Sequence, residues 1–439
     1  MAKYSKNIII GAGLSGLSCG YDLNDCTIFE QESSAGGLCR TYEFQKFRYD
    51  IGGHRFFTSN KNTEEFFKYL VGPNLLTIER KSKIYWKNRF IDYPLKVSVV
   101  FNLSPWQTIW CLTTYLYRLF KPLDGSSFDI RAKNKFGDNL YHLFLKNYTQ
   151  KVWGMPCHNI SKELVDIRLQ NISLLRVIKH AFRKNQDIKS FSDNFLYPQM
   201  GIQEIIDRLA MDQHIHYNSR ITGIRTYQNR IQEVEVNHNE IWNVDNLVST
   251  IPLPQLISLL NAPQPVLKAS HQLKYRNIIL VFLILNRKRF TSNHWIYFPQ
   301  NQIFGRLHEP KNWSPRMAVK DKTGVCLEIF CDPNQDIWNM PSTEIAHQVI
   351  RDMPLLKPFD VIDHCVHKIK YAYPVYDLNY RENLNLIHDH LKQFKNLYIL
   401  GRTGAFRYIN MDTCIEEGLH LQKCLKAKPE QRSEITCTP

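Results

Sequence analysis

The sequence predicts an α/β (α+β) fold in which a parallel-sheet domain is interrupted twice, first by helices and then by an antiparallel sheet. An apolar β-branched run and a glycine-rich turn open the chain at residues 7–17. Residues 104–189 carry apolar side chains at three- and four-residue spacing, which is typical of helices. Residues 277–330 hold several apolar runs of strand length. Two later runs, 247–252 and 396–401, are typical of core strands that return to the first sheet.

The opening stretch predicts a βαβ unit that binds a dinucleotide. Its turn has the pattern G-x-G-x-x-G and comprises Gly11, Gly13, Leu14, Ser15 and Gly16. Gly11 permits the tight turn, Gly13 lets the backbone approach a pyrophosphate, and Gly16 lets helix and strand pack closely. The diphosphate would lie on the amides of the helix N-terminus. Glu30 ends the second short apolar run, where its carboxylate can accept hydrogen bonds from a ribose.

A second group of glycines favours FAD over NAD. Gly36 and Gly37 precede Leu38 and Arg40, and Gly53 precedes His54. An extended FAD needs close backbone approach at several points, whereas nicotinamide dehydrogenases generally lack this second glycine pair; the alternative is that these glycines form ordinary turns. The combination resembles the N-terminus of the amine oxidase, protoporphyrinogen oxidase and UDP-galactopyranose mutase superfamily. That resemblance implies an FAD-binding Rossmann-like (GR2-type) domain.

Length and composition limit the possible partners. The 439 residues suggest two or three domains, and 56 basic against 41 acidic residues give a net charge of +15 that attracts anions. There is no run of five or more Lys and Arg, so no nucleic-acid partner is expected. The eleven cysteines form no C-x-x-C pair and the histidine pairs lack acidic or sulfur partners at ligand spacing, so we expect no disulfide framework and no metal site. A cytoplasmic location without a signal peptide is expected.

One apolar stretch requires a test for membrane insertion. Residues 97–117 carry no charged side chain, but they include several polar residues and a proline, which argues against a transmembrane segment. A helix beginning at Ser104-Pro105 is expected instead, because serine is a good N-cap and proline suits the first helical position. Peripheral membrane contact through Trp106, Trp110 and Tyr115 stays open, and so does the oligomeric state.

The expected domain boundaries follow from these patterns. A helix is expected near residues 62–70, a hairpin at 83–94 with Lys87-Asn88 as its turn, and a last helix at 412–424. We expect FAD-binding segments at 1–80, 196–260 and 371–425, a helical insertion at 81–195, an antiparallel-sheet substrate domain at 261–370, and a disordered tail at 426–439.

The run 400–412 carries the most specific resemblance. A strand ends at Gly401, a basic turn contains Arg402 and Tyr408, and a helix begins near Met411-Asp412. This helix N-terminus can face the cofactor from the side opposite the first glycine turn. The run resembles the C-terminal signature of UDP-galactopyranose mutases. The resemblance implies that Gly401, Arg402, Met411 and Asp412 contact FAD.

Three other segments resemble the same family in the same order. They contain Trp153, Arg306 and Tyr373. The resemblance implies that Trp153 stacks near the uridine or sugar part of the substrate, that Arg306 binds a phosphate, and that Tyr373 binds the diphosphate. His54 falls where the family has a histidine beside the flavin. The family's further substrate-binding arginine has Arg168 as its nearest candidate, displaced by one position. The likeness spans residues 8–419, but the stretch 310–340 is more similar to a branch labelled as amine or protoporphyrinogen oxidase.

By resemblance, the function is FAD-dependent isomerisation of a nucleotide-linked sugar between pyranose and furanose rings, through an adduct of the sugar with flavin N5. His54, Arg402 and Tyr408 would be catalytic, and Tyr408 would also bind substrate. The reduced cofactor would need an external reductant such as NAD(P)H or a reductase, and a role in cell-surface polysaccharide biosynthesis is implied. The alternatives are an FAD oxidoreductase acting on an amine or a porphyrinogen-like compound, and a flavin-bound scaffold without turnover.

Overall fold

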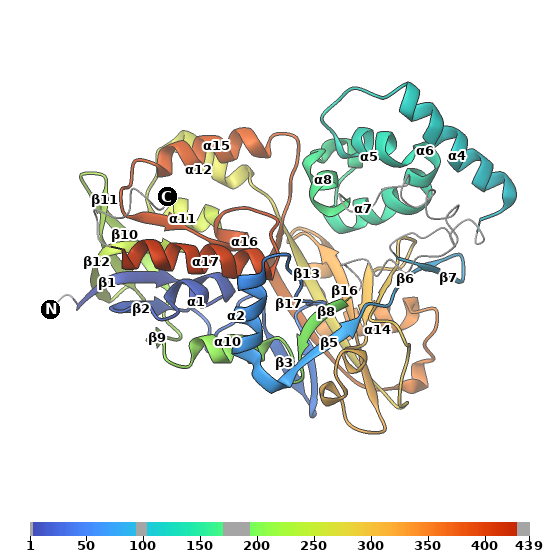
Figure 1. Cartoon of the computed structure of the whole chain (residues 1–439), viewed down its shortest axis with the longest axis horizontal. Helices are drawn as coiled ribbons and strands as arrows, with labels where there is room; N and C mark the ends of the chain where they lie inside the picture. The colour runs from blue at the N-terminus through green and yellow to red at the C-terminus, as the bar shows by residue number, and fades with distance from the viewer. Residues whose placement is uncertain (1–2, 94–102, 170–193, 428–439) are drawn as a thin grey trace.

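The computed structural model describes residues 3–93, 103–169 and 194–427, and it confirms the mixed α/β class. Two seven-stranded sheets form its framework. In Figure 1 the first sheet lies at the left, the second lies towards the lower right, and a group of helices, α4 to α8, lies at the upper right.

The first sheet is built on the opening strand. Residues Ile8 to Ile10 of β1 are buried, as the apolar run predicts, and β1 pairs in parallel with β12 on one side and β2 on the other. The return strand β18 also pairs in parallel with β12, which confirms the expectation for residues 247–252 and 396–401. The strands, in order, are β10 (Ile221–Tyr227), β11 (Arg230–Val236), β12 (Glu240–Ser249), β1 (Lys3–Ile10), β2 (Cys26–Phe29) and β9 (Ile215–His216), with β18 (Leu397–Ile399) against β12.

The second sheet is antiparallel except at one pair. β13 is buried along all eleven residues because β16 and β17 flank it. Its strands, in order, are β17 (Val361–Pro374), β13 (Tyr275–Leu285), β16 (Thr323–Cys331), β15 (Arg306–His308), β14 (Trp295–Tyr297), β6 (Ser82–Trp86) and β7 (Arg89–Asp92). Strands β6 and β7 form the expected hairpin, with Lys87 and Asn88 at φ values of 48° and 60°. They join this sheet through the parallel pair β6–β14, although they fall in the segment expected to be helical.

Two two-stranded antiparallel sheets and the remaining helices complete the fold. β3 (Thr41–Phe44) pairs with β4 (Phe47–Asp50), and β5 (Leu75–Glu79) pairs with β8 (Asn194–Pro198). The helices outside the upper-right group are α1 (Leu14–Gly20), α2 (Lys61–Val71), α10 (Gln203–Ala210), α11 (Leu253–Leu259), α12 (Gln264–Gln272), α13 (Asp336–Asn339), α14 (Ser342–Asp352), α15 (Tyr380–Leu391), α16 (Gly401–Gly404) and α17 (Met411–Lys426).

The helical group contains the apolar stretch that required a membrane test. α4 begins as expected, because Ser104 and Gln107 form a reciprocal capping box ahead of Pro105. Trp106 and Trp110 are exposed, but Tyr115 is buried, so Tyr115 was wrongly grouped with them. No helix in the described ranges is long and apolar enough to cross a membrane. The group comprises α4 (Pro105–Phe120), α5 (Phe128–Phe136), α6 (Asp138–Leu140), a π-helix (Tyr141–Leu145), α7 (Lys146–Trp153) and α8 (Glu163–Leu169). Expected helix beyond residue 169, to 189, and the expected tail from 428 onward lie outside the described residues.

Candidate active site

The glycine turn between β1 and α1 leaves an open approach to the backbone. A Cβ added at Gly13 would meet no atom within 4 Å, whereas one at Gly16 would lie 2.1 Å from the carbonyl oxygen of Gly11. Gly11 itself has a φ of +99°, a conformation that glycine adopts without steric cost. Gly16 therefore serves close packing, and Gly13 leaves room for a ligand against the amides of α1.

Glu30 has a structural partner that the sequence did not predict. Its carboxylate is buried and accepts hydrogen bonds from the amide of Ala12 at 2.8 Å and from the amide of Glu32 at 3.0 Å. Each carboxylate oxygen can accept more than one hydrogen bond, so a ribose contact remains compatible with this role. Glu30 thus holds the glycine turn against the end of β2.

The second glycine pair and the C-terminal run meet this turn. The amide of Gly36 donates to the carbonyl of Ala12 at 2.9 Å, and a Cβ at Gly37 would lie 3.4 Å from the Cα of Gly13. Gly401 has a φ of +80°, and a Cβ there would lie 2.9 Å from the hydroxyl of Ser15. The glycine turn, the second glycine pair and Gly401, which are far apart in the chain, therefore form one wall of the candidate site, here called the first wall.

Several polar atoms in this region are buried without a partner among the described residues. They are the Nε of Arg40, the Nδ1 of His54 and the Oδ1 of Asp412. A buried polar group without a hydrogen bond is costly, so these atoms fit a polar cofactor that supplies the missing partners. Leu38 is half-buried, and Met411 is buried in the apolar core, so the expected cofactor contacts of their side chains stay predictions.

His54 is held in its neutral form. Burial, and then the positive charge of Arg402, lower the pKa of His54 to about 3. A neutral imidazole carries one N–H donor and one acceptor nitrogen, and it can therefore orient a polar group without adding charge. Gly53 places this histidine, because a Cβ there would lie 2.0 Å from the indole nitrogen of Trp295.

Arg306 lies in a buried ion pair. Its Nε donates to Glu328 Oε1 at 2.7 Å, and its Nη2 contacts the other oxygen of Glu328 and the hydroxyl of Tyr373, the latter at 3.3 Å. Burial would raise the pKa of Glu328, but Arg306 and then His308 outweigh it and lower the pKa to about 2. The carboxylate is thus ionised, and it fixes the plane of the Arg306 guanidinium.

Two tyrosines and one arginine stand next to this pair. The rings of Tyr373 and Tyr408 are 6.0 Å apart and nearly parallel, and the Arg402 guanidinium lies 5.5 Å from both ring centroids. Arg402 also donates to the carbonyl of Ile409 at 2.9 and 2.7 Å, which closes the turn before α17. Burial would raise the pKa of Tyr408, but the charges of Arg168 and then Arg402 lower it.

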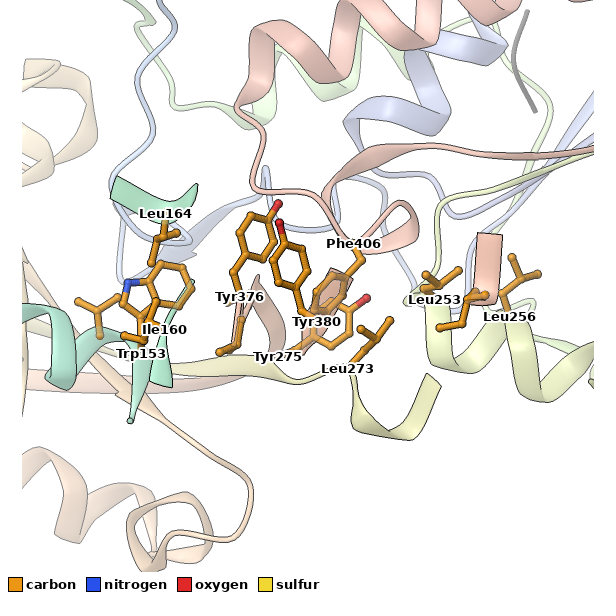
Figure 2. Close-up of a cluster of buried hydrophobic side chains, with 14 of the residues drawn as sticks. Trp153, Ile160, Leu164, Leu253, Leu256, Leu273, Tyr275, Tyr376, Tyr380 and Phe406 are labelled. Atoms are coloured by element: carbon orange, nitrogen blue, oxygen red, sulfur yellow. The ribbon is translucent and has the colours of Figure 1, made fainter. Parts of the chain in front are cut away.

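Trp153 and Arg168 come from the helical group and line a cavity. The Arg168 guanidinium lies 5.7 Å from the Trp153 ring and 5.6 Å from the Tyr408 ring. Trp153 is only 2% exposed, and Figure 2 shows its indole beside Ile160 and Leu164 in the core. One part of the indole therefore packs in the core while the residue also borders the cavity. The cavity holds about 700 Å³ of unfilled space, part of it open to solvent, and its aromatic lining includes Tyr93, Tyr148, Trp153 and Tyr297.

The structure thus places the predicted site residues in two groups, each of which forms one wall of the candidate site. The glycines, Glu30 and Gly401 form the first wall, and His54, Trp153, Arg168, Arg306, Tyr373, Arg402 and Tyr408 form the second. Glu328, Tyr148 and Tyr297 were missed. A lone carboxylate in the apolar strand Thr323–Cys331 was the signal available for Glu328. No cluster of three potential metal ligands occurs within the described ranges.

Comparison with known proteins matches residues 14–420 to the model of the family described as flavin containing amine oxidoreductase. The chain belongs to this family. Its fold is similar to that of a reduced UDP-galactopyranose mutase, with a TM-score of 0.84 and 20% identity over 98% of this chain and 97% of that one. It is also similar to a putative protoporphyrinogen oxidase from Exiguobacterium sp. 255-15, with a TM-score of 0.74 and 15% identity over 96% and 99%. A putrescine oxidase variant gives a TM-score of 0.69 and 13% identity over 98% and 100%.

These similarities confirm the predicted fold and the flavin-containing family. The family implies an FAD-type cofactor, and the open backbone at Gly13 together with the unpartnered atoms of Arg40, His54 and Asp412 fits one. Identities of 13–20% carry the fold and not the reaction.

Proposed function

We propose that this chain is an FAD-dependent mutase that interconverts the pyranose and furanose forms of a nucleotide-linked sugar. The observation that carries the proposal is the convergence of Arg168, Arg306 and Arg402 with Tyr373 and Tyr408 at the second wall, beside the cavity. Planar guanidiniums and tyrosine hydroxyls are the donors that suit a diphosphate.

Each side chain has a role in this proposal. Arg306, whose Nη1 has no partner among the described residues, would donate to the diphosphate while Glu328 holds its orientation. Trp153 and the tyrosines would give a flat apolar surface to the base or the sugar ring. Neutral His54 would orient the flavin edge, and Arg402 would act beside it. Bound FAD in its reduced form would supply the nucleophile for the anomeric carbon.

The charges at the site favour this proposal over an amine oxidase. The parallel rings of Tyr373 and Tyr408 are the kind of aromatic pair that amine oxidases present. However, Arg402 already lies over both rings and Arg168 lies over one of them. A cationic amine would therefore be repelled, whereas an anionic leaving group would be attracted. The external reductant, the cytoplasmic location and a role in cell-surface polysaccharide synthesis belong to the same proposal.

The test is nucleotide binding by the purified holoenzyme before and after reduction with dithionite. We expect the reduced enzyme to bind UDP and to convert UDP-galactose into a product that chromatographs as the furanose. Arg306→Lys keeps a charge beside Glu328 but loses the planar fork, so UDP should bind about 10- to 100-fold more weakly.

The matched control is Arg225→Lys, an exposed arginine paired with Glu233 in the first sheet, which should leave UDP binding unchanged. If reduction does not affect nucleotide binding and Arg306→Lys is silent, the mutase proposal is wrong. Rapid reduction of the oxidised flavin by an amine or a porphyrinogen would favour the oxidoreductase instead.

A further inference from the structure

Arg168 lies near the C-terminal end of α8, a helix of only seven residues. Its guanidinium is 5.7 Å from the centroid of the Trp153 ring and 5.6 Å from that of the Tyr408 ring, and it lines the cavity. A helix this short has little stability of its own, so its position depends on the contacts that hold it. The attachment of α8 therefore decides where Arg168 lies.

Glu163 stands in the first turn of α8 and binds two residues of α15. Arg381 donates from Nε to one carboxylate oxygen of Glu163 and from Nη2 to the other, and the hydroxyl of Tyr380 donates to the second oxygen. A bidentate arginine–carboxylate pair fixes both distance and orientation. The amide of Ser161, just before the helix, also donates to the carbonyl of Tyr376 at 2.8 Å. The start of α8 is therefore attached to the chain that leads into α15.

The same part of the chain supports the turn that carries Tyr408. The hydroxyl of Tyr376 accepts a hydrogen bond from the amide of Tyr408 at 2.8 Å. The rings of Tyr376 and Tyr380 are stacked, with centroids 4.2 Å apart, and they lie beside the ring of Phe406, as Figure 2 shows. The residues that bind the carboxylate on α8 thus belong to the structure that holds Tyr408 in place.

The ion pair is too exposed to add much to the stability of the whole chain. The side chain of Arg381 is 65% exposed and that of Glu163 is 27% exposed, and exposed ion pairs contribute little to folding. The core contacts of α8 come instead from Leu164 and Val165, which are fully buried. These apolar side chains keep the helix packed, whereas Glu163 sets where its first turn lies relative to α15.

We infer that Glu163 is a positioning residue that holds Arg168 over the Tyr408 ring. This inference rests on the proposed function, in which Arg168 meets the diphosphate. Glu163 is not among the described residues that line the cavity, so it would act on the substrate only through Arg168.

The experiment measures the dissociation constant of UDP on the reduced holoenzyme in a double-mutant cycle of Glu163→Gln and Arg168→Met. We expect Glu163→Gln alone to weaken UDP binding about fivefold, because Arg168 loses its orientation towards the diphosphate. In the Arg168→Met background the same substitution should have less than about a twofold effect, since the residue through which it acts is gone. Arg381→Met breaks the same pair from the other side and should reproduce the effect of Glu163→Gln.

Asp166→Asn is the matched control. Asp166 stands on the same helix and is paired with Arg131 of α5 at 2.9 Å, so its ion pair lies within the helical group. This variant should bind UDP within about twofold of the wild type. Amide exchange of the proteins without nucleotide gives a second readout, in which residues 163–169 should exchange faster in Glu163→Gln than in the wild type or the control.

A loss of affinity that Glu163→Gln keeps in the Arg168→Met background would overturn the inference. So would a silent Glu163→Gln, or a loss that equals that of the control. In these cases, UDP binding that depends on Arg306 would leave the mutase proposal standing. If the wild type binds no UDP, the mutase proposal fails and amide exchange decides the inference: faster exchange of residues 163–169 in Glu163→Gln alone supports it, and unchanged exchange overturns it.

Discussion

At the scale of single residues, Asp50 shows how burial changes a titration. Its carboxyl is fully buried and accepts hydrogen bonds from the hydroxyl of Thr41 at 2.6 Å, the hydroxyl of Tyr197 at 2.7 Å and the amide of Ile202 at 3.2 Å. These bonds join the end of β4 to β8 and to the start of α10. Burial raises the pKa of Asp50 from 3.8 to about 6, and the three hydrogen bonds only partly oppose this effect.

The raised pKa gives a pH dependence of stability with a definite sign. Between about pH 4 and pH 6 the folded chain keeps the Asp50 proton and the unfolded chain does not, so the free energy of unfolding decreases as pH rises. The decrease should be on the order of 3 kcal/mol and should level off above pH 6. Asp50→Asn cannot titrate and should lack this component. Denaturant unfolding of both proteins at several pH values measures it, and equal slopes would contradict the prediction.

The sequence predicted which residues belong to the candidate site only where those residues lie in a recognisable motif. Arg306, Tyr373 and Tyr408 were identified from their motifs and lie together. Glu328 was not, because its importance comes from its register opposite Arg306 in the second sheet, and register between strands is a tertiary property. Trp153 was expected to face substrate, and the structure gives it a core contact as well.

At the scale of elements, the contact between α1 and the glycine turn contains one glycine that serves folding and another that serves cofactor binding. A methyl group at Gly16 would overlap the carbonyl of Gly11, whereas a methyl group at Gly13 would point into open space. Gly13 has a φ of −79°, which alanine adopts easily. The motif therefore needs glycine at position 16 for close packing of the helix on the turn, and glycine at position 13 to leave room for a ligand.

The corresponding variants should behave differently. Gly13→Ala should keep the thermal midpoint of the flavin-free protein within about 2 °C but lose most of its bound flavin, because the methyl group would occupy the approach to the pyrophosphate. Gly16→Ala should lower the midpoint markedly, since overpacking forces the backbone to move. The flavin absorbance of the purified proteins and thermal unfolding of the flavin-free forms measure both effects. A fully flavinated Gly13→Ala protein would refute the assignment.

Local patterns predicted most elements because their causes are local. The capping box of α4, the glycine and asparagine turn conformations and the buried runs of β1 and β13 all follow from short-range chemistry. The parallel pairing of β6 with β14 joins residues 82–84 to residues 295–297, and no local pattern specifies it. The exposure of Trp106 beside the burial of Tyr115 likewise depends on how α4 packs.

At the scale of the molecule, the cavity depends on how the helical group is attached to the second sheet. Lys151 of α7 donates to the carbonyls of Phe298, Gln302 and Phe304 and so fixes the loop after β14. Arg276 of β13 makes the other attachment. It is buried, and it donates to the carbonyl of Val152 at 3.0 Å, which is at the C-terminal end of α7, and to the carbonyl of Phe330 at 2.8 Å in β16.

Arg276 is therefore expected to hold α7, which carries Trp153, in register with the second sheet, which carries Arg306. Arg276→Met keeps the apolar stem but leaves these carbonyls without a donor, which should lower the free energy of unfolding by about 3 kcal/mol. Amides of residues 146–154 should exchange with solvent faster, and the affinity for UDP should fall several-fold although Arg276 lies outside the proposed binding set. The matched control is Arg287→Met, just after the opposite end of β13, where the arginine is paired with Asp360 and is 33% exposed. If both variants changed exchange in residues 146–154 equally, α7 and the second sheet would be coupled through the sheet as a whole and not through Arg276.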